Sequence, residues 1–232
     1  MAVSFDSLLA TDAEIALLCT QDYPGITPNA WRLAQGTDGS ATGLAFSSVA
    51  VNFETYGVVP GMVLGLGESS KPRGDLLEIT AVSGTSLTLK RLGMDAGVGM
   101  GPTLASGVAN YTFEVPTCYA AIAEATATLR AKYGASASSD LLRHACRLTV
   151  LCRLYGAAHQ LAGLAQETGD NYRAKYRQYK AELDAVTATL DATYGPTPDD
   201  SAAPASGPRR RPAIGFTADQ SDWPLSNGLW DR

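Results

Sequence analysis

The sequence predicts an α+β fold: a helical bundle with an inserted, small, barrel-like antiparallel β domain, followed by an extended C-terminal arm. Apolar residues recur at helical spacing in two stretches, 1–36 and 116–194. Between them, at 37–115, glycine becomes frequent and short alternating apolar runs lie between turn residues. From 195 to 232 the content of Pro, Asp, Ser and Ala is too high for a core. These stretches are the predicted helical domain, β domain and arm.

The first helix is marked by a capping box. Thr11 precedes Glu14 by three residues, the pattern in which each side chain satisfies a free backbone amide at a helix start, and the apolar run "IALL" follows. The stretch "GITPNAWRLAQG" (25–36) holds a capping threonine, a proline suited to the first turn and a terminal glycine. It predicts a short helix that contains Trp31.

The β domain is predicted from about five alternating runs bounded by turn residues. These are "GLAFSSVAVNF" (43–53), "GMVLGLG" (61–67), "DLLEITAV" (75–82), "SLTLKRL" (86–92) and "NYTFEV" (110–115). The clearest hairpin is "LLEITAVSGTSLTLKRL", where "SGTS" supplies the glycine that a tight turn needs. Closure of the strands into a barrel would hide their edges.

Three helices are predicted after the β domain. The first has an apolar step of three and four residues from Tyr119 to Tyr133 and ends at Gly134. The second, 139–167, is capped by Ser138 or Ser139 and is apolar on several faces, so it must be covered from several sides. The third, 170–194, has a seam with steps of 4, 3, 4, 3 and 4, for packing along another helix: Tyr172, Tyr176, Tyr179, Leu183, Val186 and Leu190.

The other face of this last helix carries four cations: Arg173, Lys175, Arg177 and Lys180. Such a face is most often simply solvated, and the functional alternative is a surface that lines a channel for nucleic acid. The net charge of -5 excludes a protein that coats nucleic acid over its whole surface, so only local basic patches remain. The tyrosines of the two long helices follow the helical repeat, which favours core and subunit contacts over base stacking.

The predicted arm combines positive charge with large aromatic residues. Its residues of interest are Arg209, Arg210, Arg211, Phe216, Trp223 and Trp230. Disordered segments usually lack aromatic residues, so this composition favours an arm that becomes ordered on a partner over a frayed terminus.

The sequence offers little for catalysis or cofactor binding. The four cysteines show no CxxC spacing and indicate free thiols in a reducing compartment, and the two histidines, His144 and His159, lie at spacings unsuited to zinc. The glycines of "GMDAGVGMGP" (93–102) are not followed by a helix, as a phosphate-binding loop requires. We therefore expect no enzyme activity, no cofactor and no metal, and the N-terminal residues predict neither a signal peptide nor a membrane anchor.

The order of these parts resembles the head-tail connector (adaptor) proteins of tailed bacteriophages. The resemblance rests on "LLATDAEIALL", on "GVVPGMVLGLG" and "EITAVSGTSLTLKRL" in the β insertion, on "YAAIAEATATLRAKYG", and on the two long helices and the arm. It covers the helical stretches at 1–35 and 116–194 best, and the β insertion of about 80 residues sets this chain apart from the smallest members.

The resemblance implies a structural protein of the virion, at the head-tail junction, made in the host cytoplasm. Members form a homo-oligomeric ring, commonly of roughly twelve copies, under the portal protein. The ring extends the channel through which double-stranded DNA passes without sequence-specific binding, and it offers a platform to the tail or to the next neck protein. The arm would reach the portal. Two alternatives remain: another neck or tail-completion protein, and a binding module or enzyme built on the β domain.

Overall fold

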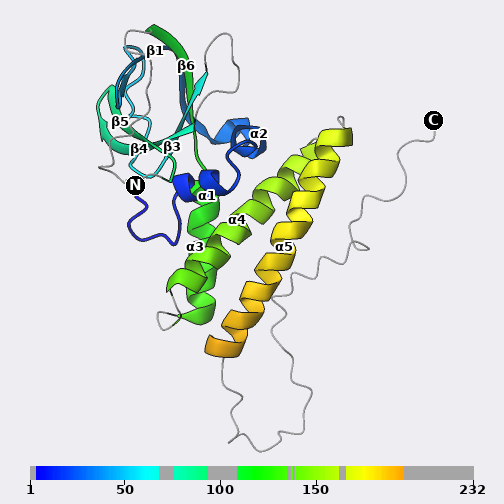
Figure 1. Ribbon diagram of the computed structural model, residues 1–232. Helices are drawn as coiled ribbons and strands as arrows, with labels where there is room; N and C mark the ends of the chain where they lie inside the picture. The colour runs from blue at the N-terminus through cyan, green and yellow to red at the C-terminus, as the bar shows by residue number, and fades with distance from the viewer. Residues whose placement is uncertain are drawn as a thin grey trace, which may run out of the picture. The chain divides into compact units, whose positions relative to one another are not determined.

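The computed structural model describes residues 4–67, 76–93, 109–134, 137, 139–161 and 166–195. Within these ranges the chain forms five α-helices, one 3-10 helix and six strands (Figure 1). This mixture confirms the predicted α+β class. The glycine-rich stretch from 94 to 102 and the predicted arm beyond Gly195 lie outside the described residues.

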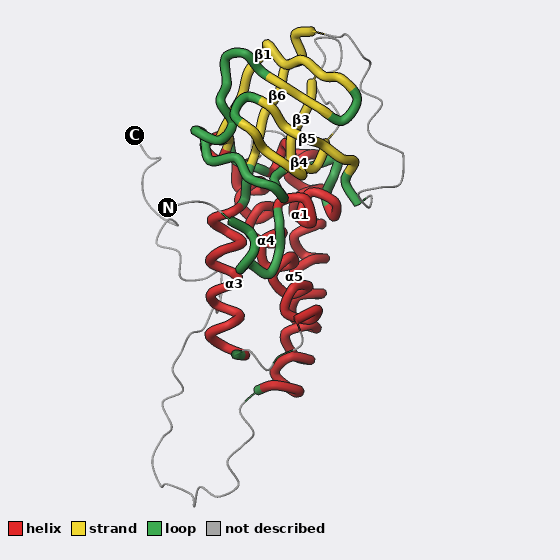
Figure 2. Tube along the Cα trace, turned by 90° about the vertical axis from the view of Figure 1, so that its left-hand side faces the viewer, coloured by secondary structure: helices red, strands yellow, loops and turns green. Residues whose placement is uncertain are grey.

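Six antiparallel strands close into a barrel, so the barrel-like part of the prediction is confirmed (Figure 2). In chain order the strands are β1 (Arg32–Thr42), β2 (Ala45–Ser47), β3 (Val63–Gly67), β4 (Leu76–Ser83), β5 (Ser86–Arg91) and β6 (Ala109–Pro116). Around the barrel their order is β1-β2-β5-β4-β3-β6. The β4–β5 hairpin forms as predicted: Ser83 pairs with Ser86, and Gly84 has the positive φ of 57° that favours glycine.

Three phenylalanines fill the barrel interior. The rings of Phe46 and Phe113 meet edge to face with centroids 5.1 Å apart, and Phe53 lies 5.8 Å from Phe113. All three side chains are buried, so they pack as one aromatic cluster.

The strand β1 was not predicted, because its sequence "RLAQGTDGSAT" has the glycine content of a loop. The structure supplies the reason for the glycines. A Cβ on Gly36 would lie 2.6 Å from the ring of Phe113, and a Cβ on Gly39 would lie 2.6 Å from the ring of Phe46. Glycine therefore makes room for the aromatic cluster, and the pairing of β1 with β6 shifts register on both sides of Gly39.

The helices largely follow the prediction. They are α1 (Asp12–Leu18), α2 (Tyr23–Ile26), the 3-10 helix η1 (Asn29–Trp31), α3 (Tyr119–Tyr133), α4 (Ser139–Leu161) and α5 (Gln166–Tyr194). The capping box of α1 is confirmed by the bonds Glu14 N to Thr11 Oγ1 at 3.3 Å and Thr11 N to Glu14 Oε2 at 3.0 Å. Gly134, with φ of 68°, ends α3.

Three helix boundaries differ from the prediction. The helix expected at 25–36 is confined to η1, because the chain enters β1 at Arg32. The helix predicted at 139–167 ends at Leu161, and the next one begins at Gln166 rather than 170. The short helix α2 was not predicted.

The helices and the barrel share one hydrophobic core. α4 packs along α5 and against α3, while α1 packs against β3, β4 and α4. The chain enters and leaves the barrel at one place: Arg32 pairs with Pro116, and the amide of Thr117 donates to the carbonyl of Trp31 at 2.9 Å. The strands thus run from Arg32 to Pro116, slightly beyond the predicted 37–115 on both sides.

Candidate functional site

The four predicted cations of α5 separate into two environments. Arg173, Arg177 and Lys180 are exposed, and their spacing of four and three residues places them along one side of the helix. Lys175 points elsewhere: its ammonium pairs with the carboxylate of Asp22, which follows α1. Three of the four residues therefore form one exposed basic strip.

Asp22 joins α5 to α4 through Lys175 and Tyr155. The hydroxyl of Tyr155 donates to Oδ2 of Asp22 at 2.6 Å, and Lys175 pairs with the same oxygen. The Lys175 ammonium also lies 5.8 Å from the centre of the Tyr155 ring. The hydrogen bond to Asp22 raises the pKa of Lys175, while burial, followed by the bond to Asp22, raises the pKa of Tyr155. Lys175 is thus part of the packing between the helices.

The tyrosines of the long helices pack within the subunit, as predicted. Tyr155 is fully buried, with Tyr179 stacked on it at 5.5 Å and Tyr172 edge-on at 5.8 Å. Each of these rings is therefore engaged in packing between the helices. The hydroxyl of Tyr179 also donates to the carbonyl of Leu18 at 3.3 Å, which connects α5 to the end of α1.

The apolar seam of α5 is only partly covered. We call it the inner seam: Tyr172, Tyr176, Tyr179, Leu183, Val186 and Leu190. Leu190 is fully buried, whereas the other five side chains are partly buried against the core. Beside Tyr179, at the end of α1, Leu17 is 50% exposed and Leu18 is 43% exposed. Apolar surface on α5 and α1 is therefore left accessible in the single subunit.

Asp12 forms a buried polar junction that the sequence did not reveal. Its carboxylate accepts hydrogen bonds from Thr117 Oγ1 at 2.6 Å, from the Cys118 amide at 2.9 Å and from the Cys118 thiol at 2.9 Å. Burial raises the pKa of Asp12 to about 6 and raises the pKa of Cys118 well above its usual value. A fully buried thiol with a raised pKa is a poor nucleophile, so this junction links α1 to the start of α3 rather than serving catalysis.

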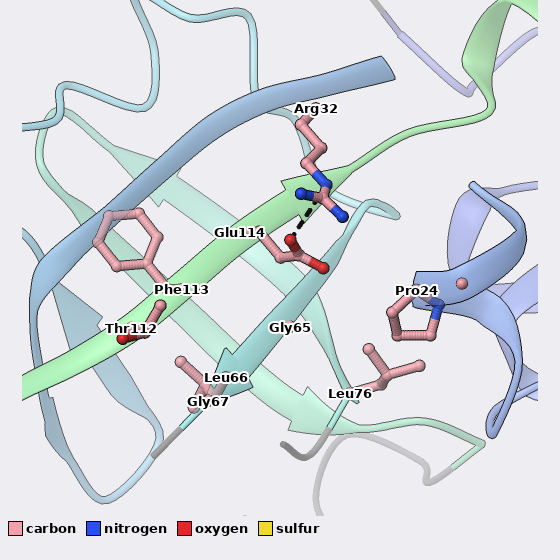
Figure 3. A pocket seen from close by; sticks show the side chains of 10 residues that line it. Pro24, Arg32, Gly65, Leu66, Gly67, Leu76, Thr112, Phe113 and Glu114 are labelled. Atoms are coloured by element: carbon pink, nitrogen blue, oxygen red, sulfur yellow. Dashed lines mark ion pairs between the residues drawn. The ribbon is translucent and has the colours of Figure 1, made fainter. Parts of the chain in front are cut away.

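A pocket of about 310 Å³ lies where the barrel faces α2 (Figure 3). It is lined by Pro24 and Gly25 of α2, by Arg32, and by residues 65–67, 112–114 and Leu76 of the barrel. Figure 3 shows Arg32 and Glu114 facing each other across one side, with Nε 3.1 Å from Oε2. Their geometry gives an ion pair without a hydrogen bond at Nε. The two charges neutralise each other. The described lining residues hold one carboxylate, the hydroxyl of Thr112 and no histidine or cysteine, so they offer no acid-base pair to activate a nucleophile.

The histidines are contact residues, as predicted. His144 Nε2 lies 3.0 Å from Oε1 of Glu182, and His159 Nδ1 lies 3.1 Å from the carbonyl of Gly169. In the part of the chain that the structure describes, no three His, Cys, Asp or Glu side chains come together as a possible metal site. None of the described helices has the length and apolar character to cross a membrane.

All six predicted residues of the arm, Arg209 to Arg211, Phe216, Trp223 and Trp230, lie outside the described residues. The candidate site of the described chain is therefore the exposed basic strip of α5, together with the partly covered inner seam and the adjoining end of α1. Comparison with protein-family models, with curated proteins and with solved structures gave no match to this chain.

Proposed function

We propose that this chain is a structural head-tail connector of a tailed-phage virion. It would assemble as a ring under the portal protein, extend the DNA channel and link the head to the tail. The observation that supports the proposal most is the partly covered inner seam of α5 next to the exposed Leu17 and Leu18.

The accessible apolar surface of the inner seam, Leu17 and Leu18 favours assembly with neighbouring subunits. Apolar area that stays accessible in one subunit gains free energy when a neighbour covers it. In a ring, each subunit contacts one neighbour through one surface and the other neighbour through a different surface. Repeating such a contact gives a ring when the successive rotations add up to a full turn. α3, α4 and α5 would then form the helical bundle of each subunit in the ring.

The basic strip suits a channel for DNA that must slide. Arg173, Arg177 and Lys180 are exposed, and neutralising phosphates with three cations per subunit gives binding that is independent of sequence and weakened by salt. Lys180 is already paired with Asp184 in the next turn, which lowers the charge further. Such a surface would hold DNA weakly.

The arm is proposed from its sequence alone. Arg209, Arg210 and Arg211 would steer it to an acidic surface of the portal, and Phe216, Trp223 and Trp230 would anchor it. Each tryptophan could bury about 200 Å². Ordering the arm costs about 1 to 2 kcal/mol per residue, so one arm binds weakly. Several arms around a ring bind more tightly, because the first contact raises the effective concentration of the rest.

The ring and the arm are tested together with purified portal protein. We expect full-length chain to bind the portal and to show the mass of a ring by native mass measurement. A chain truncated after Gly207 and the Trp223→Ala/Trp230→Ala variant should bind more weakly. Equal binding by all three would remove the arm as the anchor, and a monomer both alone and with the portal would contradict the connector proposal.

The basic strip is tested by replacing Arg173, Arg177 and Lys180 with Gln. Folding should be unchanged, because the three side chains are exposed, while DNA retention in particles should fall. Arg130→Gln on α3 serves as the control for loss of an exposed cation from another helix. Unchanged retention would assign the strip to ordinary solvation.

The alternative of another neck or tail-completion protein shares the ring but not the portal contact. A ring that forms with a tail component and does not bind the portal protein would support that alternative. A binding module on the barrel has one observation in its favour, the pocket beside Arg32 and Glu114. The clustered acids or aromatic side chains that carbohydrate binding or glycoside chemistry needs do not line it.

A further inference from the structure

α5 has a second heptad pattern on the side opposite its inner seam. We call it the outer seam: Ala174, Gln178, Ala181, Ala185, Ala188 and Ala192. Its steps are 4, 3, 4, 3 and 4, as in the inner seam, and all six residues are exposed. At about 100° per residue the two seams lie about 160° apart around the helix. The outer seam is therefore on the side turned away from α4.

Charged residues follow one border of the outer seam in a fixed order. We call them the charged edge: Arg173, Arg177, Lys180, Asp184 and Asp191. All five are exposed, and the cations occupy the first half of the helix while the acids occupy the second half. Among the described residues, the ion pairs of this edge are Lys180 with Asp184 and Lys132 with Asp191. Neither Arg173 nor Arg177 has an ion pair in that part of the chain.

This order of charge favours pairing of α5 with α5 of a second copy in the antiparallel orientation. If two copies of α5 meet in parallel through the outer seam, their charged edges lie on opposite sides of the contact and cannot pair with each other. If they meet antiparallel about a twofold axis that passes between Ala181 and Ala185, the charged edges lie on the same side of the contact and the cationic half of each copy faces the acidic half of the other. The charged edges are thus complementary to each other only in the antiparallel arrangement.

The small residues fit the same arrangement, since the outer seam is alanine at every position but Gln178. With the twofold axis between Ala181 and Ala185, Ala174 lies opposite Ala192 of the second copy and Ala181 opposite Ala185. Methyl side chains let two helices approach closely, so the charged edges at the border come within reach of each other. The side chains of Lys180 and Asp184 are 48% and 62% exposed, so they are free to exchange their pairing within one helix for pairing between copies.

We infer that α5 pairs with α5 of a second copy of this chain, antiparallel, through the outer seam and the charged edge. The inference does not rest on the proposed function, because it uses only α5. It goes beyond that function by giving the isolated protein a twofold contact distinct from the neighbour contacts of a ring. In the pair the basic strip is covered by the acids of the second copy, so pairing and DNA binding use the same cations.

The pair is weak, which sets the conditions of the test. α5 is 29 residues long, about 43 Å at 1.5 Å per residue, and one helix face of that length buries less than a standard interface of about 1,600 Å². We expect a dissociation constant on the order of 100 μM and therefore a mass that rises with concentration in sedimentation equilibrium at low salt.

The test is an exchange of charge between two variants of the full chain. Arg173→Glu/Arg177→Glu/Lys180→Glu gives an acidic edge, and Asp184→Lys with Asp191 unchanged gives a more basic one. Each variant alone should pair at least tenfold more weakly than the original chain, and an equimolar mixture should recover pairing. Arg130→Glu on α3 is the matched control and should pair normally. Circular dichroism confirms that each variant is folded.

Orientation is tested by cysteine cross-linking, since all four native cysteines are buried. Under mild oxidation, an equimolar mixture of Ala181→Cys and Ala185→Cys chains should give the mixed disulfide dimer in a clearly larger share than random coupling of the two chains would produce. An excess of same-position dimers would indicate parallel pairing and overturn the inference. A constant mass up to about 500 μM at low salt, or variants and mixture that all behave alike, would also overturn it.

Discussion

At the scale of single residues, Asp12 has the most consequential environment. Its carboxylate is fully buried and accepts three hydrogen bonds from Thr117 and Cys118, yet its pKa is raised to about 6 because burial outweighs those bonds. The sequence predicted the capping box around it but gave no sign of burial, since an acid in the first turn of a helix is usually exposed. Its burial depends on residues more than a hundred positions away in the chain.

This environment predicts that the protein becomes more stable as the pH falls from 7.5 to 5. The pKa of Asp12 is higher in the folded state, about 6, than the ordinary 3.8, so the folded state binds the proton more tightly over this range. The contribution is fully present below pH 3.8 and is lost as the pH rises through about 6. We expect about 1 kcal/mol of added unfolding free energy at pH 5, measured by urea denaturation.

The control is Asp12→Asn, which has nearly the same shape but does not ionise. The variant should be less stable at both pH values and should lack the Asp12 share of the pH dependence. All other ionisable groups are present in both proteins, so their contributions cancel in the comparison. The same pH dependence in both proteins would show that Asp12 does not ionise within the fold as described.

At the scale of elements, prediction succeeded where local pattern and tertiary packing agree. The capping box correctly predicted the start of α1, the heptad spacing predicted α5, and the glycine of "SGTS" predicted the β4–β5 hairpin. It failed for β1, whose glycines are explained only by two aromatic rings from other strands. The basic strip was predicted to contain four residues. Lys175 is not part of it, because its ammonium forms an ion pair with Asp22, which is distant in sequence. Long-range contacts are thus the common cause of the misses.

The close approach of two aromatic rings to β1 predicts that Gly36→Ala and Gly39→Ala are each destabilising. The new methyl group would overlap Phe113 in the first case and Phe46 in the second, and both rings are buried, so the overlap must be relieved inside the core. We expect a loss of about 1 to 3 kcal/mol for each, measured by chemical denaturation. Ser40→Ala, at an exposed position of the same strand, should change stability by less than about 0.5 kcal/mol. If neither variant loses more unfolding free energy than Ser40→Ala, the glycines are not needed to leave space for the aromatic cluster.

At the scale of the whole described chain, the barrel is an insertion with adjacent ends. Arg32 pairs with Pro116, and Trp31 and Thr117 share a backbone hydrogen bond, so a short linker could close the chain without the barrel. Helix α1 nevertheless depends on both parts. It packs against α4 on one side and against β3 and β4 on the other, and the amide of Ala13 donates to the carbonyl of Gly61 at 3.0 Å. The helices and the barrel are therefore continuous in packing although separable in sequence.

This arrangement predicts the outcome of replacing residues 32–116 with a short Gly/Ser linker. α3, α4 and α5 should remain folded, because the contacts of α4 with α3 and α5 and the Asp22 junction lie outside the barrel. Removing the barrel uncovers one side of α1, so the melting temperature should fall by roughly 10 to 20 °C. Far-UV circular dichroism should retain the signal of the remaining helices. A control chain carries the same linker between Trp31 and Arg32 with the barrel intact, and it should melt within a few degrees of the original chain. Wholesale loss of helix in the deletion, with the control folded, would mean that the helices cannot hold their structure without the barrel, and the description of the β domain as an insertion would then be wrong.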